Sequence, residues 1–201
     1  MNVILSKYVY VLQKIYWFAY LQVLWMLFTL LGLGVFGIFP ATHALITVLK
    51  EKDLSSGEAF REFRNAFTCS FIKLSGAALI WHFMFLLIST NLLIFQSIYL
   101  KYLVMGMIGL LFLSMIHFFQ YLETNQPIVS QVKRAFSFVW VLPKNNAGYF
   151  FILVLELLAI AFIPGITFFF GISIAAYFIV KIGNSEENKR LQAKLAERSI
   201  S

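Results

Sequence analysis

Long runs of apolar residues constrain the fold of this chain more than any other feature of its sequence. A helix needs about 20 apolar residues to cross a bilayer core about 30 Å thick. Runs near that length occupy 15–33, 72–95, 102–122, 148–163 and 166–180. Hydrophobic residues make up 61% of the 201 residues and charged residues 12%, against about 25% charged residues in a soluble domain. The sequence therefore predicts one all-α, polytopic membrane domain over residues 1–201.

The first apolar run is too long for one span, because the uncharged block extends from Ile15 to Leu49. Glycine and proline are the residues that most weaken a helix interior. Four of them interrupt this block: Gly32, Gly34, Gly37 and Pro40. We therefore predict a span at 15–33, a helix break, and a short re-entrant or sixth helix at 40–49. The glycines also match a dinucleotide-binding fingerprint as text, but no strand precedes them, so this interpretation is rejected.

Basic residues are distributed unevenly among the segments between the apolar runs. Thirteen of the 16 lysines and arginines lie in 50–73, 123–147 and the tail from 181, whereas the opposite loops hold only Lys101. Cytoplasmic loops carry the excess of Lys and Arg. We therefore expect a multi-pass protein of the bacterial cytoplasmic membrane with a cytoplasmic tail at 183–201. The remaining two, Lys7 and Lys14, favour a cytoplasmic N-terminus, which requires the 40–49 helix to fold back.

Two segments between the runs, 55–71 and 127–142, have the periodicity of amphipathic helices. Ser55 and Glu58 form a capping-box pattern at the start of the first. Its expected interfacial residues are Phe60, Phe63 and Phe67 on one face and Arg61 and Arg64 on the other. Either the phenylalanines insert among lipid headgroups while the arginines face anionic lipid, or the phenylalanines pack on the spans. The sequence leaves both arrangements open.

Ionisable residues inside the predicted spans are the candidate functional residues, because a charge in the membrane is costly. His82 and His117 lie at similar depths in the second and third spans, and Glu156 lies at a similar level in the fourth. They predict an intramembrane polar pocket that binds a substrate group or passes a proton. The alternative is a set of hydrogen bonds that only lock the helices together.

Other chemistry has little support in the sequence. The single cysteine, Cys69, excludes an internal disulfide and a multi-thiolate metal site. No zinc-protease, nucleophile-elbow or phosphate-loop motif is present. The net charge is +7, and the basic residues responsible for it flank apolar runs, as expected for membrane topology. We therefore expect no catalytic residue, cofactor, metal or nucleic-acid partner.

Several segments resemble the YesL-like family of small bacterial membrane proteins of unknown function. They are the Trp/Leu/Phe run Leu24–Gly32, the Phe39–Leu45 segment with its Pro-x-Thr, the Phe60–Phe67 helix, and Lys133–Phe136. The resemblance extends over about 15–182 and carries over no catalytic residue. It implies genes that often neighbour those for carbohydrate ABC transporters and polysaccharide-degrading enzymes.

Two functions follow as hypotheses. The first is an accessory or regulatory partner of a carbohydrate transport system, which docks through an apolar or small-residue face. The alternative is a small self-sufficient transporter that uses the polar pocket. The expected partners are a lipid bilayer with anionic headgroups and either a subunit of an ABC-type sugar transporter or a second copy of the chain.

Overall fold

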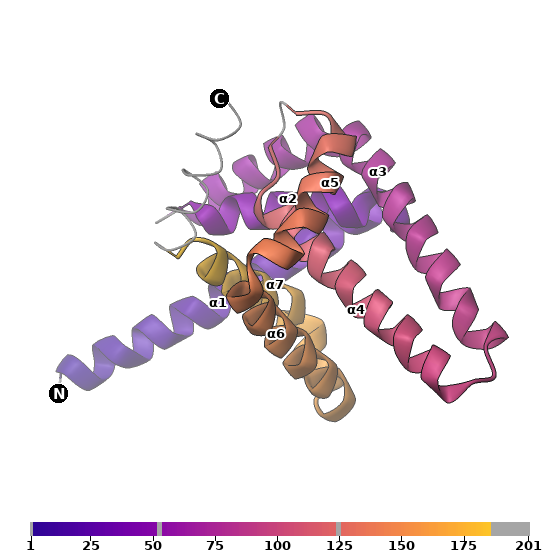
Figure 1. Cartoon of the computed structure of the whole chain (residues 1–201). Coiled ribbons are helices and arrows are strands. Elements are labelled where there is room, and N and C mark those ends of the chain that lie inside the picture. The colour runs from indigo at the N-terminus through magenta and orange to yellow at the C-terminus, as the bar shows by residue number, and fades with distance from the viewer. Residues whose placement is uncertain (1, 52–53, 124–125, 186–201) are drawn as a thin grey trace.

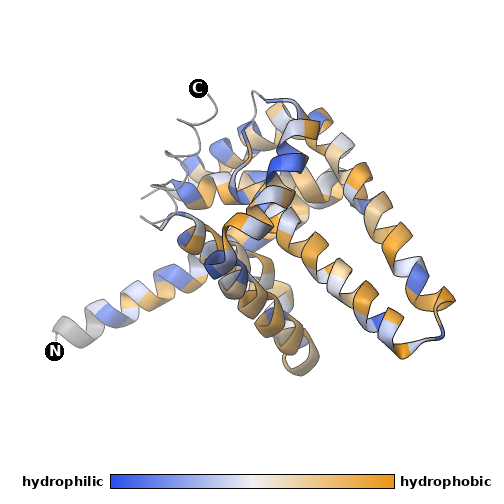
Figure 2. Ribbon diagram, in the orientation of Figure 1, coloured by the Kyte–Doolittle hydropathy of each residue, from blue (hydrophilic) through white to orange (hydrophobic). Residues whose placement is uncertain are grey.

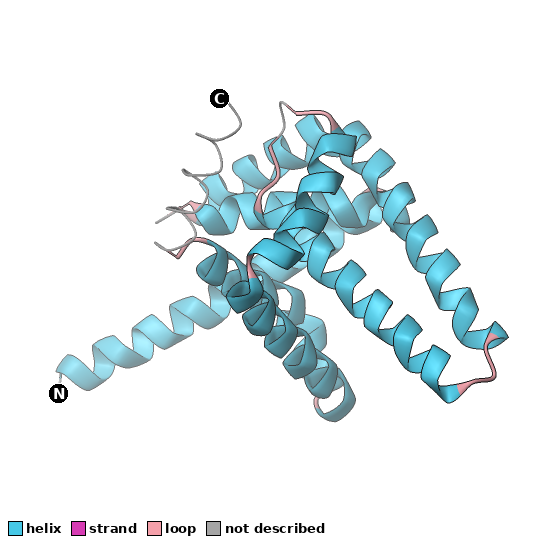
Figure 3. Ribbon diagram, in the orientation of Figure 1, coloured by secondary structure: helices cyan, strands magenta, loops and turns pink. Residues whose placement is uncertain are grey.

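The computed structural model describes residues 2–51, 54–123 and 126–185, and this part of the chain is helical, with short loops and no strand (Figures 1 and 3). Five helices, α1, α3, α4, α6 and α7, are long and apolar enough to cross a membrane. The all-α, polytopic membrane fold is therefore confirmed. The helices are α1 (Asn2–Leu31), α2 (Val35–Lys50), α3 (Ser56–Ile94), α4 (Ile98–Gln120), α5 (Ile128–Val141), α6 (Pro143–Phe162) and α7 (Pro164–Gly183). The predicted tail lies almost entirely outside the described residues.

Two antiparallel hairpins, α3–α4 and α6–α7, extend in the same direction from a body that contains α2 and α5 (Figure 1). Only Ile163 separates α6 from α7, so the two helices are joined by a tight turn. The hairpins are predominantly hydrophobic along their length (Figure 2). Their surfaces carry exposed apolar side chains, such as Leu93 at 87% and Phe162 at 79% exposure. Such surfaces are suited to lipid or to another apolar protein surface.

The predicted interfacial helix at 55–71 and the span at 72–95 form one continuous helix, α3, and not two. Its start is the predicted capping box, in which the Ser55 hydroxyl accepts from the Glu58 N–H and the Glu58 carboxylate accepts from the Ser55 N–H. No proline interrupts the helix near residue 71, so it can continue through this point.

The phenylalanine stripe of α3 packs on α1. The Phe28 ring centroid lies 5.0 Å from those of Phe63 and Phe67 and 6.1 Å from that of Phe60. Phe63 and Phe67 are buried, whereas Arg61 and Arg64 on the other face are exposed. Of the two arrangements that the sequence left open, the structure shows packing on a span for Phe63 and Phe67.

The break between α1 and α2 is earlier and tighter than predicted. Leu33 and Gly34 have positive φ values of 58° and 70°, which reverse the chain. Gly32 then packs on Gly37 so closely that a β-carbon on Gly32 would clash with the Gly37 Cα. The helix break therefore lies at 32–34, Gly37 permits close packing, and the predicted contribution of Pro40 to the break is wrong.

Pro40 lies inside α2 without ending it. Proline has no N–H, so the carbonyl of Phe36, four residues earlier, lacks its helical donor. The Ser75 hydroxyl of α3 donates to this carbonyl at 3.0 Å. A residue from a neighbouring helix thus replaces the hydrogen bond that the proline removes.

Candidate functional site

The structure does not join the three residues of the predicted polar pocket. His82 Nδ1 lies 2.7 Å from the Ala78 carbonyl of its own helix. Glu156 packs against α7, where a β-carbon on Gly171 would clash with its Oε1. His117 interacts with α6. Among the described residues, no hydrogen bond or ion pair connects any two of His82, His117 and Glu156.

The structure does not bring His82 and His117 together across the α3–α4 hairpin. Trp81 and Phe118 meet across the α3–α4 hairpin with ring centroids 6.2 Å apart. His82 and His117 are the immediate neighbours of this pair in sequence. Successive side chains point about 100° apart around a helix axis. Both histidine side chains therefore point away from the α3–α4 interface at this level.

His117 instead belongs to a buried polar cluster between α4 and α6. Its side chain is fully buried, and its Nε2 lies 2.7 Å from Asn146 Oδ1. The Asn146 amide donates to the Val139 carbonyl, which leaves Oδ1 as the acceptor and assigns the proton to His117 Nε2. The His117 ring also stacks on Tyr121 at 5.9 Å and meets the edge of Tyr149 at 5.2 Å. This arrangement holds two helices together, as in the packing alternative.

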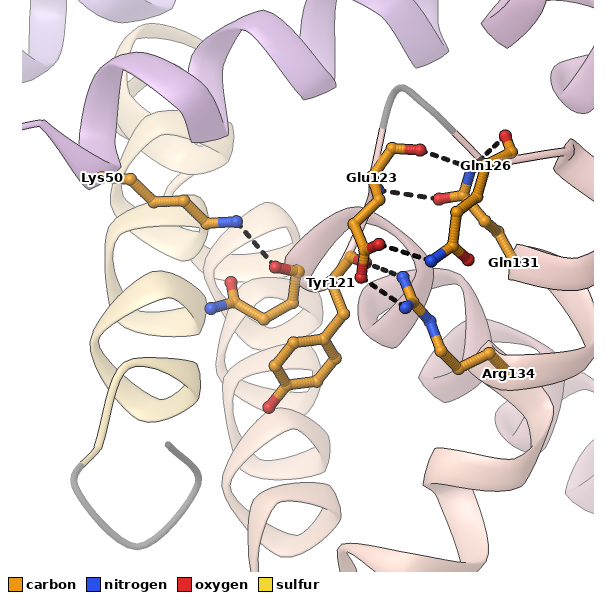
Figure 4. A network of polar contacts seen from close by, with 7 residues as sticks. Lys50, Tyr121, Glu123, Gln126, Gln131 and Arg134 are labelled. Carbon is orange, nitrogen blue, oxygen red and sulfur yellow. Dashed lines mark hydrogen bonds and ion pairs between the residues drawn. The ribbon is translucent and has the colours of Figure 1, made fainter. Parts of the chain in front are cut away.

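A second polar cluster holds the connection between α4 and α5 (Figure 4). Gln131 of α5 is only 2% exposed. Its amide donates to the carbonyls of Glu123 and Gln126, and its oxygen accepts from the Glu123 N–H. This one side chain fixes both sides of the connection.

Two basic side chains bind backbone carbonyls at the carboxyl end of α4 (Figure 4). Lys50 donates to the Gln120 carbonyl at 2.6 Å, and Arg134 donates to the Tyr121 carbonyl and pairs with Glu123. Such cations stabilise the negative end of a helix dipole. Burial of its ammonium end lowers the pKa of Lys50 from its usual value of 10.5.

Gln22 joins α1 to α7 and was not identified from the sequence. It is 3% exposed, its amide donates to the Phe168 carbonyl at 3.1 Å, and its oxygen accepts from the Ser173 N–H at 3.0 Å. A glutamine inside an apolar run is the signal that could have drawn attention to it, because a polar side chain in a membrane span needs a partner.

A cleft of about 580 Å³ lies where α1, α2 and α7 meet. Lys14, Lys50 and Lys181 line it together with one carboxylate, Glu51. Within the described ranges, the only ion pair is Arg134–Glu123, so Glu51 is not paired with any of the three lysines. The cleft is therefore net positive and can attract an anion. It also places the N-terminal Lys14 at the same end of the molecule as the two other lysines.

The cleft combines charged and aromatic side chains. Its walls include the aromatic side chains of Trp17, Phe18 and Tyr177. No group of three His, Cys, Asp or Glu residues that could hold a metal ion occurs in the part of the chain that the structure describes. The sequence did not predict this cleft, because its lysines are separated by up to 167 positions (181 − 14) in the chain.

Comparison with known proteins finds similarity over part of the chain. Residues 18–92 match the family described as "Protein of unknown function, DUF624". The chain is 65% identical to "Uncharacterized protein YteU" of Bacillus subtilis (strain 168) over 34 residues, which are 17% of this chain and 15% of that protein. It is 45% identical to "Uncharacterized protein YesL" of the same organism over 58 residues, 26% of this chain and 28% of that protein.

The aligned regions cover less than a third of each of these two relatives. No solved structure matches the chain. The family match includes the Trp/Leu/Phe run, the Pro-x-Thr segment and the phenylalanine stripe, but it ends before the Lys133–Phe136 segment. The comparisons support the expected resemblance to the YesL-like family, and the family match lies in parts of α1 and α3 and the whole of α2.

Proposed function

We propose that this protein is an accessory or regulatory subunit of a carbohydrate transport system in the bacterial cytoplasmic membrane. The observation that carries the proposal is how few residues of α6 are buried in the protein. Only Asn145 and Tyr149 of its 20 residues are buried. A helix that contributes so little to the core of its own chain offers most of its surface to lipid or to a partner.

One face of α6 is suited to docking. Phe151, Leu155, Leu158 and Phe162 follow one another at spacings of four, three and four residues, and all are exposed. This spacing places them along one side of a helix. The carbohydrate part of the proposal rests on the resemblance to the YesL-like family and on the gene neighbourhood that this resemblance implies. The cytoplasmic orientation of the lysine-rich end rests on the distribution of Lys and Arg.

The test is affinity capture of the tagged protein from its own membranes in a mild detergent, followed by mass spectrometry. We expect a near-stoichiometric subunit of a sugar transporter. The variant Phe151→Ala/Leu155→Ala should lose this subunit. The matched control Phe83→Ala/Leu87→Ala removes the same residue types at the same spacing from exposed positions of α3 and should retain it. If the α6 variant captures as much of the transporter subunit as the wild type does, docking through this face is excluded.

The alternative is a self-sufficient transporter, and recovery of the protein alone or with copies of itself would favour it. It ranks second because His82, His117 and Glu156 each have separate neighbours. A coupled transporter needs intramembrane polar groups that act together at one site. We propose no enzymatic activity.

A further inference from the structure

We propose that the cleft between α1, α2 and α7 binds the phosphate of an anionic phospholipid headgroup through Lys14, Lys50 and Lys181. This inference goes beyond the accessory role and is independent of it, because it concerns another surface of the molecule. Helices α1, α2 and α7 each contribute one of these lysines to a single cavity.

Among the described residues, nothing neutralises the positive charge of the cleft. One carboxylate, Glu51, accompanies three lysines, and none of the lysines forms an ion pair with another described residue. Lys14 lies 5.6 Å from the ring centroid of Tyr10, which also lines the cleft. This contact orients the ammonium without removing its charge. The result is a site with an excess of two positive charges, which favours an anion.

The walls of the cleft point to a lipid and not to a small soluble anion. Trp17 and Tyr177 stand beside the lysines, together with aliphatic residues such as Leu49 and Val180. Tryptophan and tyrosine are the residues that mark the headgroup level of a membrane, and a phospholipid joins a charged phosphate to apolar chains. A cavity of about 580 Å³ is large enough for a headgroup and its glycerol.

Lys50 differs from the other two lysines, since it donates to the Gln120 carbonyl. The Gln120 amide in turn lies 3.4 Å from the Asn184 oxygen at the edge of the cleft. This contact fixes the end of α4 beneath the site. Lys50 is therefore left unchanged in the test, because its replacement would disturb α4 as well as the cleft.

The test uses the full-length protein in a non-ionic detergent, with native mass spectrometry of bound lipid. Phosphatidylglycerol is the probe, and phosphatidylcholine and glycerol phosphate are the comparison ligands. The variant is Lys14→Gln/Lys181→Gln. A lysine near anionic lipid contributes about 1 kcal/mol. Two lysines therefore correspond to an affinity loss of about 30-fold, since each 1.4 kcal/mol is about tenfold.

Two control variants separate the site from the overall charge and from misfolding. Lys133→Gln removes an exposed lysine of α5 that does not line the cleft, and phosphatidylglycerol should bind this variant as it binds the wild type. Lys14→Arg/Lys181→Arg keeps both charges and should restore most of the binding that the glutamine variant loses.

Three outcomes would overturn the proposal. One is equal binding of phosphatidylglycerol to the wild type and the Lys14→Gln/Lys181→Gln variant. Another is equal binding of phosphatidylcholine and phosphatidylglycerol to the wild type, because the proposal needs a net negative headgroup. The third is displacement of phosphatidylglycerol by glycerol phosphate at equal concentration, which would assign the site to a soluble phosphate ester. Selective, lysine-dependent binding of phosphatidylglycerol would support it.

Discussion

The hydrogen bond from Ser75 to the Phe36 carbonyl allows a quantitative test of how α2 accommodates Pro40. Replacement of Ser75 by alanine leaves that carbonyl without a donor, because Pro40 has no N–H to offer. A net hydrogen bond contributes about 0.5–1.5 kcal/mol. Interhelical hydrogen bonds in a membrane protein average about 0.6 kcal/mol. We therefore expect Ser75→Ala to lower the free energy of unfolding by about 1 kcal/mol.

The same substitution should cost much less in the Pro40→Ala background. An alanine at position 40 restores an N–H that can donate to the Phe36 carbonyl within α2, so the Ser75 hydroxyl becomes redundant. The double-mutant cycle of Ser75→Ala and Pro40→Ala should therefore show a coupling energy of about 1 kcal/mol. Changes in helix propensity at either position cancel in the cycle.

The assay is equilibrium unfolding in mixed micelles with increasing mole fractions of a denaturing detergent, followed by circular dichroism. Ser70→Ala is the matched control, because Ser70 is a buried serine of α3 whose hydroxyl donates to the Ala66 carbonyl of its own helix. It should show no coupling to Pro40→Ala. An equal cost of Ser75→Ala in the proline and alanine backgrounds would refute the reasoning.

Three further substitutions test other parts of the structure with the same unfolding assay. Gln22→Leu removes both hydrogen bonds between α1 and α7 and should lower the free energy of unfolding by about 1 kcal/mol; no change would argue against this link. Gly32→Ala forces a β-carbon against the Gly37 Cα and should cost about 1–3 kcal/mol, whereas Gly57→Ala, which has open space, should be neutral or stabilising; equal effects would contradict the close packing. Glu156→Gln should not destabilise the protein, because a charge in the membrane is costly and no ion pair in the described ranges includes Glu156; a clear loss of stability would reveal a role for its charge.

The candidate site was only partly predictable from the sequence. Hydropathy and helical rise estimate the position of a residue along its helix, whereas side-chain contacts also depend on how each helix is rotated about its axis. Trp81 and Phe118, the sequence neighbours of the two histidines, do meet between α3 and α4. The expected meeting of His82 and His117 failed because a one-residue offset turns a side chain away from the interface. Packing of α4 against α6 then determined that His117 meets Asn146.

Gln131 shows a similar limit for the amphipathic helices. Its neighbours Lys133 and Arg134 place it on a polar face in the sequence, yet it is buried under the α4–α5 connection. A loop that returns over a helix can bury a polar residue when the loop supplies backbone donors and acceptors. The position of these backbone groups depends on the path of the loop, and the periodicity of the sequence does not predict that path.

The sequence by itself determined the helical membrane class, the apolar runs, the capping box at Ser55 and the glycine-rich reversal before α2. Each of these depends on local composition or on residues a few positions apart, whose preferences act wherever the chain lies. Only the tertiary structure decided which donor serves the Phe36 carbonyl, that Gln22 holds α7, and that three distant lysines share one cleft. These features depend on how helices rotate and cross, which is set by the packing of many side chains at once.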